Sequence, residues 1–105
     1  MEPKDKLKLM TAWDAEPALT EDELDGVLAD TALSDAVGRA QTDPDWTPTY
    51  DLNAAAAAAW LIKAARSSAV TETDPSGAVT SKIFDNCRAM ARVYAGKRNG
   101  TVPVR

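Results

Sequence analysis

The spacing of apolar residues along the chain predicts an all-α protein, a small bundle of three to four helices with a long loop and an extended C-terminal arm. Residues 4–13 predict a short first helix, because apolar side chains recur there at the three- and four-residue spacing of one helix face. The side chains expected to face inward are Leu7, Met10 and either Ala12 or Trp13.

The segment around Thr20 carries the clearest helix start in the sequence. Thr20 stands at the N-cap position and Glu23 at the third helical position, which is the pattern of a capping box. Leu19 and Leu24 flank this start at the spacing of a hydrophobic staple. The second helix then continues with one face formed by Leu24, Val27, Leu28 and Thr31.

A central helix is predicted over residues 51–69, which contain six consecutive alanines. Alanine loses no side-chain entropy in a helix, and Asp51 stands where an N-cap or first-turn acid belongs. The apolar stripe expected to face the core consists of Ala54, Ala55, Ala58, Leu61, Ile62 and Ala65. Trp60 lies on another side, with Lys63. Two interpretations stay open for Trp60, packing under a loop of its own domain or anchoring a subunit contact.

A final helix is predicted from a cap at Thr80 or Ser81 to about Ala95, with a turn at residues 71–77 before it and Gly96 at its end. The side chains expected in its core-facing stripe are Ile83, Cys87, Met90 and Tyr94, with Phe84 and Ala91 on the flank. The side chains expected to face water are Asp85, Arg88 and Arg92.

Two segments do not follow a helical pattern. Residues 34–49 are rich in turn-forming residues and predict a loop that Trp46 and Tyr50 would pin to the body. This loop is either a functional element or a flexible crossover. Residues 97–105, KRNGTVPVR, predict an extended arm, because an Asn-Gly pair and a Val-Pro-Val run do not suit a helix. The predicted organisation is one helical domain over residues 1–96 followed by the arm.

Composition narrows the possible functions. The chain has 105 residues, a formal charge of −4, no histidine and a single cysteine. The acidic balance disfavours nonspecific nucleic-acid binding through a basic face. The charged first ten residues contain no signal-peptide pattern, and the alanine run is too weakly apolar to cross a bilayer, so a soluble intracellular protein without membrane contact is expected.

No catalytic, metal or cofactor motif stands out. Without histidine, acid–base chemistry at neutral pH would depend on carboxylates or lysine, and no acid pair has a suitable setting. The isolated Gly38 and Gly96 do not form a phosphate loop. Cys87 lies within an apolar stripe and is interpreted as a small core residue. We expect no enzyme activity, no metal and no cofactor.

The block from Asp45 to Arg92 resembles the head–tail connector proteins, also called adaptor or head-completion proteins, of tailed bacteriophages and related prophages. The resemblance is carried by WTPTYDLN at 46–53, the alanine-rich helix ending in Trp60, KAA at 63–65, the pair Ser76-Gly77 and IFDNCRAMAR at 83–92. Upstream, PALTEDEL at 17–24 and the loop at 35–39 stand where such proteins carry a first long helix and a loop.

The resemblance implies a virion protein of the phage neck, made in the host bacterial cytoplasm, that forms a homo-oligomeric ring of about twelve copies beneath the portal protein. Such a ring extends the DNA channel, lets DNA pass without specific binding and presents a surface to the next neck or tail component. The residues expected at the subunit interface are Trp46, Tyr50, Trp60, Lys63 and Arg66. The residues expected to form a portal-binding arm are Lys97, Arg98, Thr101, Val102, Pro103, Val104 and Arg105.

Two other classes of function compete with the connector. A small helical regulatory protein that binds a host factor would act as a monomer or dimer and would not need the arm. A DNA-binding module would show steep salt dependence. The cationic residues available to such a module are Arg88, Arg92, Lys97 and Arg98.

Overall fold

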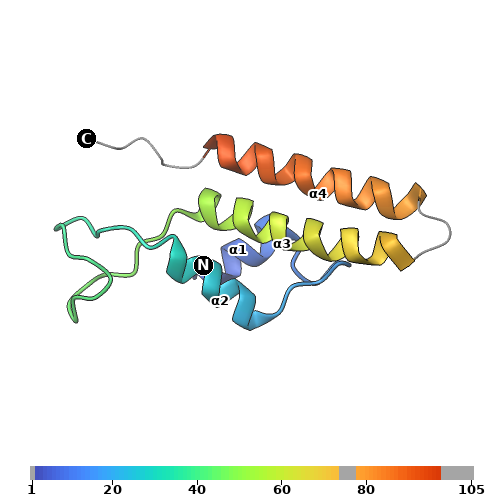
Figure 1. Cartoon of the computed structure of the whole chain (residues 1–105). Helices are drawn as coiled ribbons and strands as arrows, with labels where there is room; N and C mark the ends of the chain where they lie inside the picture. Colours follow the sequence, from blue (N-terminus) through green and yellow to red (C-terminus); the bar gives the residue numbers. More distant parts are fainter. Residues whose placement is uncertain (1, 74–77, 98–105) are drawn as a thin grey trace.

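The computed structural model of the chain describes residues 2–73 and 78–97, and over these residues the fold is all-α, as predicted (Figure 1). Its helices are α1 (Pro3–Thr11), α2 (Glu21–Asp30), α3 (Leu52–Thr73) and α4 (Ala78–Lys97). Apart from one isolated antiparallel bridge between Ala32 and Tyr50, no β-structure occurs in these ranges.

Helix α3 occupies the centre of the structure. It packs against α4 on one side and against α1 and α2 on the other, whereas α4 contacts no described helix except α3 (Figure 1). The molecule is elongated, with principal extents of 53 × 28 × 20 Å. The segment between α2 and α3 extends beyond the ends of the helices (Figure 1), so it lies away from the layers that form the core.

The first helix ends two residues earlier than predicted. Ala12 adopts a left-handed backbone conformation with φ of 45°, and this conformation ends α1 at Thr11. Trp13 therefore lies outside the helix, although its half-buried side chain still packs against the core. The helix buries Leu7 completely, as its periodicity indicates.

The second helix begins as its local sequence predicts. The Thr20 hydroxyl accepts a hydrogen bond from the Glu23 amide at 3.1 Å, and the Glu23 carboxylate accepts one from the Thr20 amide at 2.8 Å. This reciprocal pair satisfies two of the amides that a helix start leaves without partners. The core residues contributed by this region are Leu19, Leu24, Val27 and Leu28.

The predicted core face of the central helix is only partly correct: Ala55, Ala58 and Ile62 join or pack against the core cluster, whereas Leu61 and Ala65 do not. Leu61 is 55% exposed, Ala65 is exposed, and Ala54, Ala58 and Ile62 are only partly buried. Of the predicted stripe, only Ala55 is fully buried. The residues of α3 that are buried instead are Ala55, Ala56, Ala57, Ala59, Lys63, Ala64 and Ser67.

The position of α3 between two layers explains this difference. Ala55, Ala56 and Ala59 join the hydrophobic cluster formed with α1 and α2, while Ala57 lies on the side of α4, where it lines a groove with Ala91. Alanine keeps the neighbouring helices close on both sides, so apolar periodicity alone does not identify the inner face. Of the predicted stripe, Leu61 and Ala65 face outward.

The α3–α4 hairpin differs from its prediction mainly at the ends. Helix α3 continues to Thr73, and α4 begins at Ala78, before the predicted cap at Thr80 or Ser81. Helix α4 also continues past Gly96 to Lys97. Its predicted faces are confirmed, with Cys87 and Ala91 buried. The half-buried residues beside them are Ile83, Phe84, Met90 and Tyr94, and the exposed ones include Asp85, Arg88 and Arg92.

Candidate functional site

A buried lysine joins α3 to the end of α1. Lys63 is only 1% exposed, and its Nζ donates hydrogen bonds to the carbonyl oxygens of Thr11, Ala12 and Ala15 at 3.1, 2.7 and 3.1 Å. These carbonyls lie at the end of α1 and in the turn after it, where a helix leaves acceptors without partners and carries partial negative charge. Burial lowers the pKa of Lys63, although nearby anionic groups oppose this shift.

Trp60 supports the same connection. Its indole Nε1 donates a hydrogen bond to the Met10 carbonyl at 3.2 Å, and the Lys63 amine lies 4.8 Å from the centre of the indole ring. The half-buried Trp60 therefore has partners inside its own chain. Of the two interpretations left open by the sequence, the structure shows a contact inside the same domain, although with the end of α1 and not with a loop.

Arg66, one turn further along α3, binds the start of α2. Its guanidinium donates to the Ala18 carbonyl at 2.9 Å and pairs with both carboxylate oxygens of Glu23. The guanidinium and the Thr20 amide together lower the pKa of Glu23 to about 2. Glu23 thus completes the capping box and also attaches α2 to α3.

Three residues predicted at the subunit interface are therefore used within the monomer. Trp60, Lys63 and Arg66 all contact the segment between Met10 and Glu23. A further role of these residues in contacts between subunits stays a prediction.

The loop between α2 and α3 is organised around the Asp35 carboxylate. Asp35 is buried, and its two oxygens accept from the amides of Val37, Arg39 and Thr47 at 3.0, 2.8 and 3.0 Å. The Arg39 guanidinium also donates to this carboxylate at 2.9 Å. These donors hold the pKa of Asp35 well below its usual range. Asp35 is not among the site residues predicted from the sequence, although Asp at the start of a turn with Gly38 three residues later is a known turn signal.

Trp46 and Tyr50 hold the base of this loop, as the sequence predicts. The Trp46 indole donates to the Leu33 carbonyl at 2.9 Å, and its ring meets the Tyr50 ring edge-on at 5.6 Å between centroids. Tyr50 also packs against the core cluster. The loop is thus a connected structure whose two sides are joined by hydrogen bonds.

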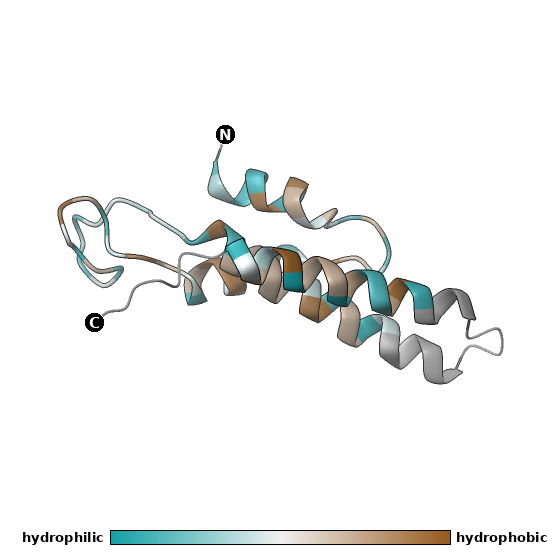
Figure 2. Cartoon of the chain, turned by 90° about the horizontal axis from the view of Figure 1, so that it is seen from above, coloured by the Kyte–Doolittle hydropathy of each residue, from teal (hydrophilic) through white to brown (hydrophobic). Residues whose placement is uncertain are grey.

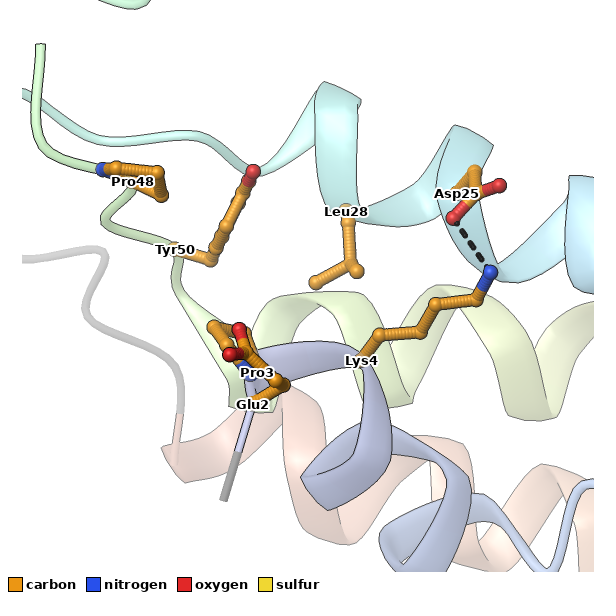
Figure 3. A pocket seen from close by; sticks show the side chains of 7 residues that line it. All are labelled: Glu2, Pro3, Lys4, Asp25, Leu28, Pro48 and Tyr50. Carbon is orange, nitrogen blue, oxygen red and sulfur yellow. Dashed lines mark ion pairs between the residues drawn. The ribbon is translucent and has the colours of Figure 1, made fainter.

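A pocket of about 260 Å³ opens between the start of α1, α2 and the end of the loop (Figure 3). Figure 3 shows Lys4 reaching Asp25, with which it pairs at 3.0 Å. Lys4 also pairs with Glu21, so its charge is already used within the chain. The residues lining the pocket are Glu2, Pro3, Lys4, Asp25, Leu28, Pro48 and Tyr50.

A second concavity, about 160 Å³ in volume, is a groove between α3 and α4. Alanines lie along it, Leu61 borders it from α3, and two arginines border it from α4. The residues lining this α3–α4 groove are Ala57, Leu61, Arg88, Ala91, Arg92 and Ala95. Leu61, the outward-facing leucine of the predicted stripe, therefore lies beside a cationic part of α4 here.

The predicted arm lies mostly outside the described residues. Lys97 is described and is the last residue of α4, so the arm cannot begin there as predicted. Its carbonyl accepts a hydrogen bond from the Asn53 side chain at 3.3 Å, which joins the end of α4 to the start of α3. The predicted arm residues that lie outside the described ranges are Arg98, Thr101, Val102, Pro103, Val104 and Arg105.

Neither metal-binding nor membrane-spanning features are found in the described ranges. No group of three or more His, Cys, Asp or Glu side chains there could hold a metal ion. No helix in residues 2–73 and 78–97 combines the length and apolar character that crossing a bilayer requires. Cys87 is buried, and burial raises the pKa of its thiol, which disfavours the reactive thiolate.

Replacing Lys63 with Met should destabilise the fold by about 2–4 kcal/mol, because three carbonyls would lose their charged donor. Urea unfolding followed by circular dichroism measures this change. Lys82→Met is the matched control, since Lys82 is exposed on α4 and its loss should change stability by less than about 0.5 kcal/mol. Equal stabilities for the two variants would show that the buried amine is not an important connection.

Glu23→Gln should lower stability at neutral pH by about 1 kcal/mol, because it removes an ion pair and weakens the capping box. The folded pKa is depressed, so this contribution is complete above the ordinary value of 4.5 and is lost as pH falls toward about 2. Unfolding free energies measured from pH 7 to pH 2.5 should converge for wild type and variant. Asp22→Asn changes an exposed neighbouring acid. Its unfolding free energy should show no difference from wild type that disappears as pH falls.

Asp35→Ala should loosen the loop while leaving the helices folded, because four donors converge on that carboxylate. Arg39 is the only trypsin site between Lys8 and Lys63, so limited trypsin digestion reports directly on the loop. Cleavage after Arg39 should accelerate in the variant at unchanged helical circular dichroism. Asp45→Ala, a change at an exposed loop acid, should digest at the wild-type rate.

The chain was compared with protein-family models, curated protein sequences and solved structures, and no match was found. The functional proposal therefore rests on the resemblance carried by residues 45–92 and on the surfaces described above.

Proposed function

We propose that this protein is a structural component of the neck of a tailed bacteriophage. In this proposal several copies form a ring, about twelve by the resemblance, that docks on the portal protein, extends the DNA channel and joins the head to the next neck or tail component. The protein acts by binding other proteins and has no catalytic role.

The observation that carries the proposal is the uncovered apolar side of the α3–α4 hairpin. Leu61 is 55% exposed, Ala65 is exposed, and three alanines line the groove that Leu61 borders. In a chain of this size, apolar surface that stays outside the core is available to a partner. This side of α3 belongs to the alanine-rich segment that also carries the resemblance to connector proteins.

The loop supports an assembly role as well. It projects beyond the helices, and it is held by Asp35, Trp46 and Tyr50 (Figure 1). A projecting element that is already ordered loses less conformational entropy on binding than a flexible one. Such an element suits a contact that is repeated between identical subunits.

The distribution of charge is compatible with a channel through which DNA passes. The formal charge of the chain is −4, and DNA is repelled by an acidic wall. Several acids of α2 are already paired, Glu21 and Asp25 with Lys4 and Glu23 with Arg66. Any acidic lining of a channel therefore depends on the acids that remain, such as Asp22.

Co-sedimentation with tailless, DNA-filled phage heads from the same source tests the proposal. The purified full chain should bind to saturation at about a dozen copies per head, counted by quantitative gel analysis of the pelleted heads. Heads assembled without portal protein are the control and should bind none. Failure of the folded protein to bind portal-containing heads would contradict the connector function and favour a regulatory protein that binds a host factor.

A further inference from the structure

The α3–α4 groove combines an apolar floor with unpaired positive charge. Arg88 and Arg92 are exposed one turn apart on α4, and neither is paired with a carboxylate of the described residues. The Arg88 guanidinium instead lies 5.6 Å from the centre of the Phe84 ring. Helix α4 carries four cationic residues and one acid, a formal charge of +3 in a chain whose total is −4.

The surrounding groups explain why these arginines have no acidic partner. Arg39 and Arg66 are each paired with an acid, as are Lys4 and Lys8. The acids of α2 thus pair with cations of α1 and α3, and α2 lies on the opposite side of α3 from α4. The groove therefore presents both apolar surface and positive charge without a matching acid from the described part of its own chain.

The projecting loop has the complementary composition. Val37 is 74% exposed, and Figure 2 shows a hydrophobic segment in the outer part of the loop. Residues 34–50 contain three acids and one arginine, a formal charge of −2. Asp35 neutralises Arg39, whereas Asp43 and Asp45 pair with no described cation. The loop thus presents one large apolar side chain and two carboxylates.

We propose that the loop of one copy, residues 34–50, docks in the α3–α4 groove of a second copy of this chain. In this contact Asp43 and Asp45 meet Arg88 and Arg92, and apolar surface of the loop covers the exposed Leu61. The inference rests on the proposed ring and names the surfaces that build it. Opposite charges steer the two surfaces together and fix their register, while apolar burial supplies most of the affinity.

The contact uses two different surfaces of the same chain. Each copy then offers one loop and one groove. A row of docked copies therefore has a free loop at one end and a free groove at the other. A head-to-tail contact of this kind closes into a ring when its rotation permits. The loop projects away from its own helices (Figure 1), which places it to reach a neighbour. A symmetric dimer would instead use the same surface on both copies.

Charge reversal tests the contact with full-length proteins. Asp43→Lys with Asp45→Lys reverses the loop, and Arg88→Glu with Arg92→Glu reverses the groove. Each double variant alone should lose self-association, with an apparent association constant lowered by about tenfold or more in sedimentation velocity. An equimolar mixture of the two double variants should assemble again, because every junction would then join opposite charges.

Matched controls separate this contact from general charge effects. Asp5→Lys with Asp22→Lys makes the same change of net charge at exposed acids outside the loop, and Lys82→Glu changes α4 outside the groove. Both control proteins should associate like wild type. Circular dichroism should show unchanged helix content in every variant.

Cross-linking gives a second measurement that does not depend on charge. In a Cys87→Ser background, a Val37→Cys chain mixed with a Leu61→Cys chain should form a heterodimer with a short bismaleimide. A Leu9→Cys chain replaces the groove partner as control, since Leu9 is 71% exposed but lies on α1. The Val37→Cys and Leu9→Cys mixture should give no such product.

The outcomes distinguish the contact from the connector function. If charge reversal does not change self-association, and Val37→Cys does not cross-link to Leu61→Cys, the proposed contact is wrong. The ring proposal would still stand. The expected reversal and rescue without binding to phage heads would support the contact and contradict the neck function. A third outcome is that the chain binds duplex DNA in a salt-dependent way, and that Arg88→Glu with Arg92→Glu abolishes this binding without changing self-association. This outcome would make the groove a DNA site and overturn the proposal.

Discussion

The connection between Lys63 and the end of α1 is the interaction on which the rest of the structure depends. Removing an ammonium group from water is costly unless hydrogen bonds replace the lost hydration. Here three carbonyl oxygens do so, at the end of α1 and in the turn after it. One buried charge therefore satisfies the end of one helix and orients another, and Trp60 and Arg66 extend this connection along α3.

The sequence predicts those parts of the fold that local chemistry determines. The start of α2 was predictable because Thr20 and Glu23 satisfy each other within one turn. The inner face of α3 was not predictable, because it depends on which helices from elsewhere in the chain pack against it. Helical periodicity alone predicts Lys63 at the surface, yet it is buried by partners about fifty positions away. Leu61, two positions before it, is exposed instead.

The residues of the candidate site also differ in how far the sequence predicts them. Trp46 and Tyr50 were recognisable as residues that hold the loop, because large aromatic side chains in a polar segment usually pack against something. Asp35 was harder to find, since its function is to accept hydrogen bonds from the backbone of its own loop. The α3–α4 groove could not have been predicted, because it forms only when the exposed Leu61 of α3 lies beside the arginines of α4.

The burial of alanine on two sides of α3 has a consequence for sequence change over evolution. Ala55, Ala56 and Ala59 pack directly against the layer of α1 and α2, and a larger side chain at these positions would push the layers apart. The outward positions, such as Ala65, carry no such restriction from the monomer. We expect homologous chains to keep small residues and a lysine on the inner side, and to vary on the outer side as their neighbours vary.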